Sequence, residues 1–358
     1  MFHRWLTPFV LIVFLVACSP QSPLLKPQAT TTPTLAMPTA TESPTSTITP
    51  TSTITPTPTP TPVPIPSLGS GTVVRLTFSP NGEILSVLTT AGVYLFQART
   101  MEFLSFLPSK NVLTALVFID DKTLATGDQS GLITVWNIYD NSKVIDSLQR
   151  IDPIVGLGIS ENKSILAVQV VSQVISVVSW EPGQPENVYP ILSAIHAPYA
   201  IYSPAKNIFV VTVNAGGKVV LIDTKRMKTA AVLCHACMFS TVSPGGNFIA
   251  SSRCCRSGSS GASRYVVFEV ASQKEIIEFT ARAFVLDFSP DEKLLLFEAE
   301  AGLSLWSVET NELVKRFDGE HAERAGFSPD GLLIASTENK TLIIRDLTSG
   351  EILFTVNF

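Results

Sequence analysis

The stretch FSPDGLLIASTENKTLIIRDLTSGEILFTVNF, residues 327–358, decides the fold of this chain. Its apolar runs are short, and they are separated by SPDG, ENK and TSG, which are rich in residues that favour tight turns. The run RAGFS, residues 324–328, leads into the first turn, so that four short strands follow one another. This pattern predicts a four-stranded antiparallel sheet in which each strand pairs with the next.

The first turn of this stretch recurs along the chain. Seven six-residue copies, each starting with an apolar residue, are FSPNGE from Phe78, FIDDKT from Phe118, ISENKS from Ile159, YSPAKN from Tyr202, VSPGGN from Val242, FSPDEK from Phe288 and FSPDGL from Phe327. The steps between them are 40, 41, 43, 40, 46 and 39 residues, and a period near 40 indicates a repeat architecture. Sheets packed face to face in a ring bury both of their faces and leave only short edges. We therefore predict an all-β fold, a seven-bladed β-propeller of four-stranded antiparallel blades, over residues 67–358.

These motifs resemble the tryptophan–aspartate (WD) repeat family. The pattern FSPDG…LLIAS…TLIIRDL…G is similar to a family repeat, and the resemblance extends from residue 72 to residue 358. The dipeptide that names the family is kept only loosely, as Trp136-Asn137, Trp306-Ser307, Ile222-Asp223 and Arg345-Asp346. The third copy, GISENKSILAVQVVSQVISVVSW, is the most divergent.

One departure from the family concerns the closure of the ring. In the family the first and last repeats usually share a blade. Here the copies run from an inner strand, TVVRLTF, to an outer strand, EILFTVNF, so that each blade is complete in itself. Closure then depends on packing between the first and last blades, unless the segment VPIPSL, residues 63–68, adds a strand.

The first residues, 1–17, have the features of a signal peptide. His3 and Arg4 precede an apolar run from Pro8 to Ala17, which is far shorter than the roughly 20 residues of a spanning helix. Leu15-Val16-Ala17-Cys18 resembles the lipobox of bacterial lipoproteins, which implies that Cys18 receives a diacylglycerol and becomes the first residue. We expect a protein anchored by lipid to the cell membrane and facing outside the cytoplasm. An ordinary signal peptide with an incidental cysteine is the alternative.

A tether follows, over residues 18–66. It consists largely of Thr, Pro and Ser, with few apolar side chains to form a core and many prolines that lack a backbone donor. This composition predicts an extended, disordered segment that holds the following domain away from the membrane. A disordered segment without a function of its own is the alternative.

Four cysteines fall close together in the fifth copy. Cys234 and Cys237 are expected to enter its inner strand, and Cys254 and Cys255 to end the strand after the SPGG turn. Antiparallel pairing around that turn brings the two pairs together, which favours two disulfides in an exported protein. A zinc site and reduced cysteines are the alternatives.

The insertion RSGSSGAS, residues 256–263, accounts for the longest step between copies. It is a candidate contact loop on the face that carries the connections between blades, although a tolerated surface insertion explains it equally well. The residues assigned to this candidate loop are Arg253, Arg256, Ser257, Gly258 and Arg264.

The sequence has few residues arranged for catalysis or metal binding. His196, His235 and His321 stand at equivalent positions of different copies, where the family has a structural histidine, so they are not expected to converge on a metal. No G-x-S-x-G, H-E-x-x-H or P-loop motif is present. The charged residues of the inner strands, Arg75, Asp287, Glu323 and Arg324, are interpreted as belonging to a solvated channel. We predict no cofactor, no metal and no enzymatic activity.

The charge of the chain indicates which class of partner it binds. The net charge is −5, and the sequence has no block of Lys and Arg, which makes nucleic acid a poor partner. The predicted function is that of a membrane-anchored platform for protein–protein interactions. The alternatives are a lactonase- or hydrolase-like propeller enzyme and a lipoprotein that binds a small ligand, since the fold alone does not choose between them.

Overall fold

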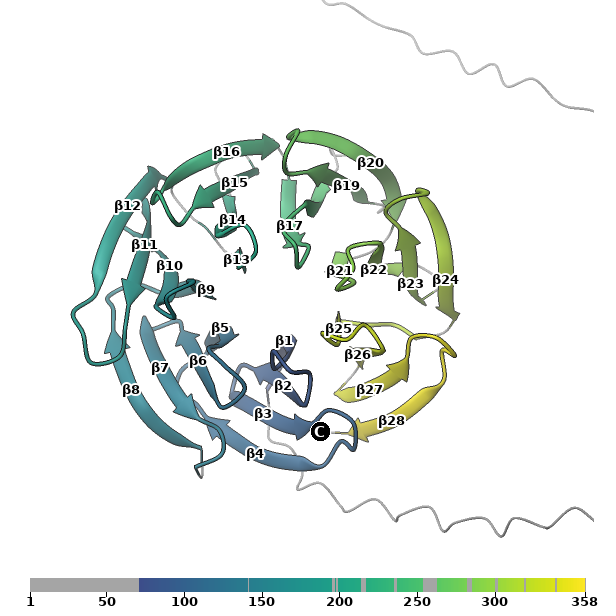
Figure 1. The fold of residues 1–358 in the computed structure, drawn as a ribbon, viewed down its shortest axis with the longest axis horizontal. Helices are drawn as coiled ribbons and strands as arrows, with labels where there is room; N and C mark the ends of the chain where they lie inside the picture. The colour runs from purple at the N-terminus through teal and green to yellow at the C-terminus, as the bar shows by residue number, and fades with distance from the viewer. Residues whose placement is uncertain are drawn as a thin grey trace, which may run out of the picture. The chain divides into compact units, whose positions relative to one another are not determined.

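A computed structural model describes residues 71–357, except 141, 195–196, 198, 214–216, 235–236, 254–262, 282–284, 300–301, 319 and 339. Strands dominate this part of the chain, and none of its residues lies in an α-helix. No helix in the described part could therefore cross a membrane. Seven four-stranded sheets stand around a central axis in chain order (Figure 1), which confirms the predicted seven-bladed propeller.

Each blade is formed by four consecutive strands, and neighbouring strands are antiparallel. The first three blades are β1 (Val73–Phe78), β2 (Ile84–Thr89), β3 (Gly92–Gln97) and β4 (Phe103–Pro108); β5 (Leu113–Phe118), β6 (Thr123–Asp128), β7 (Leu132–Asn137) and β8 (Lys143–Gln149); and β9 (Ile154–Ile159), β10 (Ile165–Val171), β11 (Val174–Trp180) and β12 (Asn187–Ser193). The next two are β13 (Tyr199–Ser203), β14 (Ile208–Val213), β15 (Lys218–Asp223) and β16 (Lys228–Cys234); and β17 (Cys237–Val242), β18 (Phe248–Arg253), β19 (Ser263–Glu269) and β20 (Lys274–Ala281). The last two are β21 (Val285–Phe288), β22 (Leu294–Ala299), β23 (Gly302–Ser307) and β24 (Glu312–Asp318); and β25 (Arg324–Phe327), β26 (Leu333–Glu338), β27 (Thr341–Asp346) and β28 (Ile352–Asn357).

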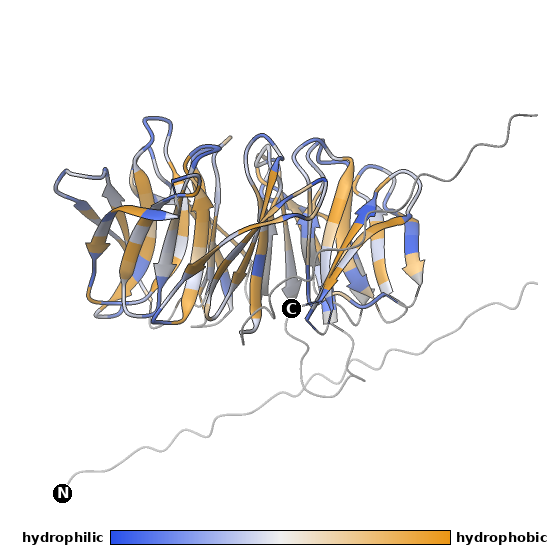
Figure 2. Cartoon of the chain, turned by 90° about the horizontal axis from the view of Figure 1, so that it is seen from below, coloured by the Kyte–Doolittle hydropathy of each residue, from blue (hydrophilic) through white to orange (hydrophobic). Residues whose placement is uncertain are grey.

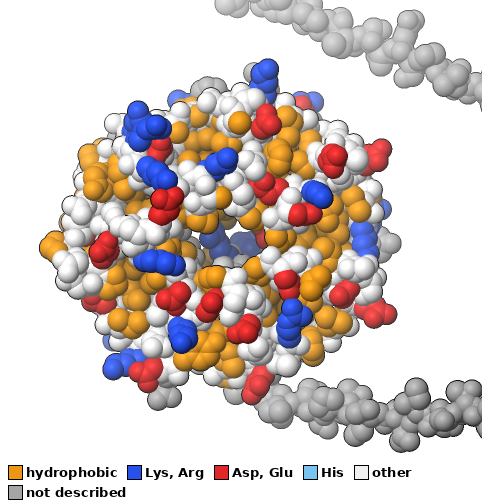
Figure 3. Space-filling view, in the orientation of Figure 1, with side chains coloured by type: hydrophobic (Ala, Val, Ile, Leu, Met, Phe, Trp, Pro, Cys, Tyr) orange, Lys and Arg blue, Asp and Glu red, His pale blue; other side chains and the backbone are white. Residues whose placement is uncertain are grey.

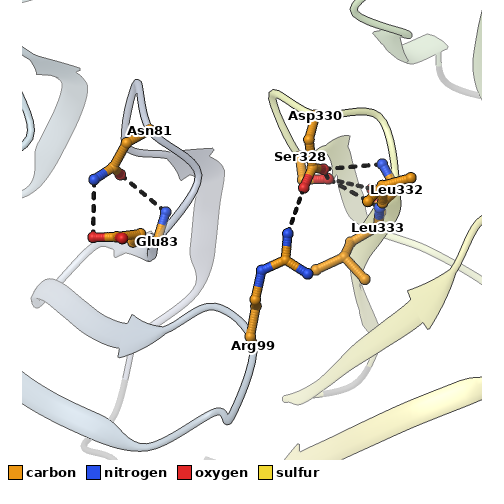
Figure 4. Close-up of polar contacts among 7 residues, drawn as sticks. All are labelled: Asn81, Glu83, Arg99, Ser328, Asp330, Leu332 and Leu333. Atoms are coloured by element: carbon orange, nitrogen blue, oxygen red, sulfur yellow. Dashed lines mark hydrogen bonds and ion pairs between the residues drawn. The ribbon is translucent and has the colours of Figure 1, made fainter.

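In blades 1, 6 and 7 the serine of the repeated turn explains why the first hairpin forms at that place. In blade 7 the Ser328 hydroxyl donates to Oδ1 of Asp330 at 2.5 Å and accepts the amide of Leu333 at 2.9 Å (Figure 4). Ser79 makes the same two contacts in blade 1, with Asn81 and Ile84. The hydroxyl thus satisfies backbone and side-chain groups that the sheet ladder does not reach, and it fixes the turn.

The hydrophobic core lies between neighbouring blades. β2, the second strand of blade 1, is buried along its whole length, whereas β8, the outer strand of blade 2, is largely exposed. The largest fully buried side chains include Phe96, Phe209 and Phe268, each in a cluster that two adjacent blades share. Figure 2 shows the same distribution, with apolar residues concentrated in the strands and polar residues in the connections. Each blade is therefore stabilised mainly by its neighbours.

The ring closes by packing and not by a shared blade. The first and last sheets each contain four consecutive strands, as the order of the copies predicts. Buried residues of blade 1, including Phe96, form one cluster with Leu333 and Ile344 of blade 7. An ion pair of 2.7 Å joins Arg99 of blade 1 to Asp330 of blade 7 (Figure 4). The segment VPIPSL lies outside the described residues.

The boundary between blades 4 and 5 differs from the prediction. Cys234 is the last residue of β16, the outer strand of blade 4, and pairs with Val219. The inner strand of blade 5 begins only at Cys237. The sequence from Cys234 to Cys237 contains no Gly, Pro, Asn or Asp that would separate the two strands. The prediction that Cys234 enters the inner strand of blade 5 was therefore wrong.

Candidate functional site

The propeller has two faces that differ in the connections they carry. We call the loop face the one formed by the turns between second and third strands and by the connections from blade to blade. The turn face carries the turns between first and second and between third and fourth strands. Because all blades have the same strand order, each kind of connection recurs on its own face around the ring. Binding residues of scaffolds of this kind concentrate on such connections.

The connection from blade 2 to blade 3 presents an unusually exposed apolar side chain on the loop face. Ile151 is 89% exposed, the highest value among the large apolar side chains that stand out as exposed. The residue before it is held in place, because the Arg150 amide donates to the Gly131 carbonyl at 2.9 Å. The Arg150 guanidinium also pairs with Glu186 of blade 3 at 2.5 Å. The Ile151 side chain is thus exposed to solvent on a connection in which the backbone and the side chain of Arg150 are held by hydrogen bonds and an ion pair.

A pocket of about 320 Å³ lies between blades 1 and 2, lined by the end of β4, the connection that follows it and residues of blade 2. Its wall combines the apolar side chains Leu107, Leu132 and Trp136 with a polar group around Asp128. Oδ1 of Asp128 accepts the amides of Ser130 and Leu132, and its Oδ2 accepts the Asn111 side-chain amide at 3.0 Å. The carboxylate therefore fixes the turn after β6. The pocket offers an apolar cleft with a preformed polar edge, a combination that suits an inserted side chain.

The central channel carries a second group of functional side chains. Figure 3 shows an opening through the ring with basic side chains visible inside it. Arg75 of β1 donates through Nη2 to the Tyr199 hydroxyl of β13 at 2.8 Å, and its guanidinium lies 5.3 Å from the centre of the Tyr199 ring. β1 and β13 belong to blades 1 and 4, so this contact bridges the channel.

Asp287 of β21 lies on the same inner ring, at the junction of blades 6 and 7. Its Oδ2 accepts the Phe327 amide of β25 at 3.0 Å, and its Oδ1 accepts the Phe288 amide at 2.9 Å. Burial raises the pKa of Asp287 to about 6, against the opposing effects of the two amides and of the positive charge on Arg75. Gly326 leaves room for this carboxylate, since a Cβ there would lie 3.2 Å from Oδ2.

His321 lies in the connection between blades 6 and 7 and forms a hydrogen bond with blade 6. Its Nδ1 lies 2.7 Å from Oε1 of Glu298 in blade 6, and Oε2 of Glu298 accepts the Ala322 amide at 2.9 Å. This hydrogen bond raises the pKa of His321. His196 and His235 lie outside the described residues. Within the described part of the chain, no three His, Cys, Asp or Glu residues stand close enough to hold a metal ion.

The cysteines and the candidate contact loop are only partly within the described structure. Cys237 pairs with Arg253 across the first hairpin of blade 5, and Arg253 pairs with Arg264 on the next strand. Arg264 forms an ion pair of 3.1 Å with Glu278 and is exposed. Cys254, Cys255, Arg256, Ser257 and Gly258 lie outside the described residues, as does Cys18. Both the disulfides and the contact loop stay predictions.

Sequence reasoning missed Ile151, the pocket and Tyr199. An isoleucine between Arg150 and Asp152, in a connection between strands, is a local signal that could have been noticed. The pocket arises from the packing of two blades and has no local signal. Tyr199 is 124 positions from Arg75, and only the closed ring brings the two together.

No family model matches the chain. A stretch of 72 residues, 20% of this chain, is 35% identical to U3 small nucleolar RNA-associated protein 12 of Saccharomyces cerevisiae, but it spans only 8% of that protein. The β-propeller domain of Cps50 (Swd1) from Myceliophteria thermophila matches with a TM-score of 0.60 and 15% identity, over 80% of this chain and 96% of that one. Hydrazine synthase of Kuenenia stuttgartiensis matches with a TM-score of 0.60 and 15% identity, over 84% and 98%. The two structures show the fold alone, and with the repeat motifs the chain is a WD-repeat-like β-propeller.

Proposed function

We propose that this protein is a lipid-anchored propeller outside the cytoplasm that serves as a platform for binding a protein partner on its loop face. The observation that carries the proposal is Ile151, an 89% exposed apolar side chain on a connection held by an ion pair. The pocket between blades 1 and 2 adds a second apolar feature. A protein interface can use both features, the exposed apolar side chain as an anchor and the pocket as a receptor for a side chain of the partner. A rigid site also loses little entropy on binding.

A protein is favoured over nucleic acid as the partner. The chain has a net charge of −5, and its densest basic stretch, Lys225-Arg226-Met227-Lys228, is short, whereas nucleic-acid affinity depends on neutralising phosphates. The yeast relative is named for an association with a nucleolar RNA, but the match to it spans 8% of that protein. We therefore transfer neither its partner nor its setting to this chain.

The membrane anchor rests on the sequence. The apolar run that ends on Leu15-Val16-Ala17-Cys18, followed by a Thr/Pro-rich tether, supports lipidation of Cys18. A tether of this composition lets the propeller reach partners at a distance from the bilayer. Cys18→Ser should move the protein out of the membrane fraction or leave its signal uncleaved. Unchanged fractionation, without an acyl group on the N-terminal peptide, would refute the anchor.

The partner site is tested by comparing two exposed apolar positions on opposite faces. Ile151 lies on the loop face, and Tyr139, which is 60% exposed, lies in the turn between β7 and β8 on the turn face. Full-length protein is captured from membranes after cross-linking, as wild type, Ile151→Asp and Tyr139→Asp. We expect Ile151→Asp to lose a protein that wild type and Tyr139→Asp retain. Equal recovery with all three would contradict the assignment of the loop face.

A further inference from the structure

The inner strands of the ring carry few charged residues, and two of them are arginines. Arg75, Asp287 and Arg324 are the charged residues that the sequence places within the bounds of the seven inner strands, and Glu323 directly precedes the last of them. β5, β9, β13 and β17 contribute none. Two arginines and two carboxylates therefore stand in or directly before the inner strands of a protein of net charge −5, and the arginines are the groups that can receive an anion. A channel with low-dielectric walls concentrates the field of such charges and attracts ions of the opposite sign.

The guanidinium of Arg75 keeps most of its hydrogen-bonding capacity. Within the described structure its Nη2 donates to the Tyr199 hydroxyl, and Arg75 takes part in no ion pair. A guanidinium has five N–H donors, and their planar fork matches the oxygens of a carboxylate or a phosphate. The side chain is half-buried and held over the Tyr199 ring. This contact orients the group in the channel before any ligand arrives.

Arg324 adds to the positive charge from the neighbouring strand. Its Nε donates to the Val74 carbonyl at 2.8 Å, and its Nη1 donates to the Glu323 carbonyl at 2.6 Å. The contact with Val74 places the Arg324 side chain against the residue before Arg75. The two cations thus stand on adjacent strands, β25 and β1, at the junction where the ring closes.

We propose that the central channel binds a small oxyanion, a carboxylate or a tetrahedral anion such as sulfate, at the guanidinium of Arg75. Tyr199 positions the guanidinium from across the channel, and Arg324 contributes charge. This site is separate from the partner site on the loop face and does not depend on it. The seven-bladed ring creates the site, because neither blade 1 nor blade 4 holds both Arg75 and Tyr199.

Asp287 sets the pH dependence of this site. Among the described inner strands the other ionisable side chains are those of Arg75, Arg324, Tyr199, Tyr202 and Cys237, with Glu323 directly before β25. Of the two carboxylates, Asp287 is the less exposed to solvent. Its pKa is raised to about 6, so that a proton neutralises it in mildly acidic solution. The charge of the channel then becomes more positive. We expect an anion that stays fully ionised to bind more tightly at pH 5 than at pH 8.

In the test, sulfate and, in a separate experiment, formate are titrated into full-length protein, and binding is measured by isothermal titration calorimetry at constant ionic strength. Wild type should bind at least one of the two in a saturable manner, and the preferred one identifies a tetrahedral or a planar ligand. Arg75→Gln should weaken binding by at least about tenfold, because it removes a charge-assisted contact. Arg99→Gln, which alters an exposed arginine on the turn face, is the matched control and should bind as wild type does.

A second measurement keeps the proposal testable if Arg75→Gln does not fold. Titration of wild-type protein labelled with ¹⁵N-arginine should shift the Nε–H resonance of Arg75, assigned from Arg75→Lys, with the same saturation curve. Ile151→Asp should leave this binding unchanged, which separates the channel site from the proposed partner site. Absence of saturable binding, or equal affinity in wild type and Arg75→Gln, would overturn the proposal.

Discussion

Truncation of Phe96 tests whether packing between blades 1 and 7 closes the ring. Phe96 lies in β3, is fully buried, and belongs to the cluster that blade 1 shares with Leu333, Leu342 and Ile344 of blade 7. Its ring meets that of Phe103 edge to face, with the centroids 5.9 Å apart. Phe96→Ala removes these contacts and leaves the backbone of the strand intact.

The expected loss of stability follows from the burial of the ring. A buried phenylalanine removes on the order of 200 Å² from water, which at about 25 cal/mol per Å² corresponds to about 5 kcal/mol. Substitutions of this type cost about 3–5 kcal/mol, which combines the lost transfer free energy of the removed atoms with the cost of the cavity that remains. Such a loss is large beside a total stability of about 5–15 kcal/mol. The exposed ion pair of Arg99 and Asp330 at the same junction should contribute less than about 1 kcal/mol.

The assay is urea unfolding of the purified full-length protein, followed by circular dichroism and by tryptophan fluorescence. Phe209→Ala is the matched control, since Phe209 is equally buried in the cluster that blades 3 and 4 share. We expect both variants to lose similar stability and to unfold in one transition with the slope of wild type. A loss below about 1 kcal/mol in Phe96→Ala alone, or a separate early transition, would refute closure by packing.

Three further outcomes are expected. Glu320→Ala should lower the free energy of unfolding in urea by about 3–5 kcal/mol, because it leaves Arg345, whose side chain is 11% exposed, without its carboxylate partner. A loss below about 1 kcal/mol would show that the pair is dispensable. The double variant Glu320→Leu with Arg345→Met should restore most of the stability. The ordinary pKa of an aspartate, 3.8, applies to Asp287 in the unfolded chain, whereas its pKa in the folded protein is about 6. Between these two pH values the folded state binds a proton that the unfolded state has lost, so the contribution of Asp287 to stability falls as the pH rises through this range. Relative to Asp287→Asn, wild type should therefore lose up to about 3 kcal/mol between pH 4 and pH 7, and a constant difference would contradict the raised pKa. Mass spectrometry of unreduced, alkylated protein should find no free thiol among Cys234, Cys237, Cys254 and Cys255, whereas four alkylated thiols with bound zinc would favour a metal site.

The fold could be predicted because its signals are local and repeated. Every copy of the turn, from FSPNGE at Phe78 to FSPDGL at Phe327, marks the first hairpin of a blade, and the chain folds into the seven four-stranded sheets that this implies. The position of Cys234 could not be predicted in the same way. The apolar sequence runs from β16 into β17 without a turn residue, so no local feature marks where blade 4 ends.

The candidate sites were predicted less well, because their residues meet only in the closed ring. Arg75 could be assigned to an inner strand from its copy, but its partner Tyr199 is 124 positions away and lies three blades further along. The pocket beside Trp136 is lined by residues of blade 1, of the connection after it and of blade 2, so it depends on packing rather than on a motif. The exposed fraction of Ile151 likewise depends on the three-dimensional structure of the connection that carries it, which the sequence does not specify.

The central claim, that a partner protein binds the loop face, is tested most directly by photo-cross-linking in intact cells. A photoreactive amino acid is placed at residue 151 or at residue 139, positions that are 89% and 60% exposed in the natural protein and lie on opposite faces. We predict a discrete cross-linked protein from residue 151 and none from residue 139. Cross-linking from residue 139 alone, or the same product from both positions, would contradict the account.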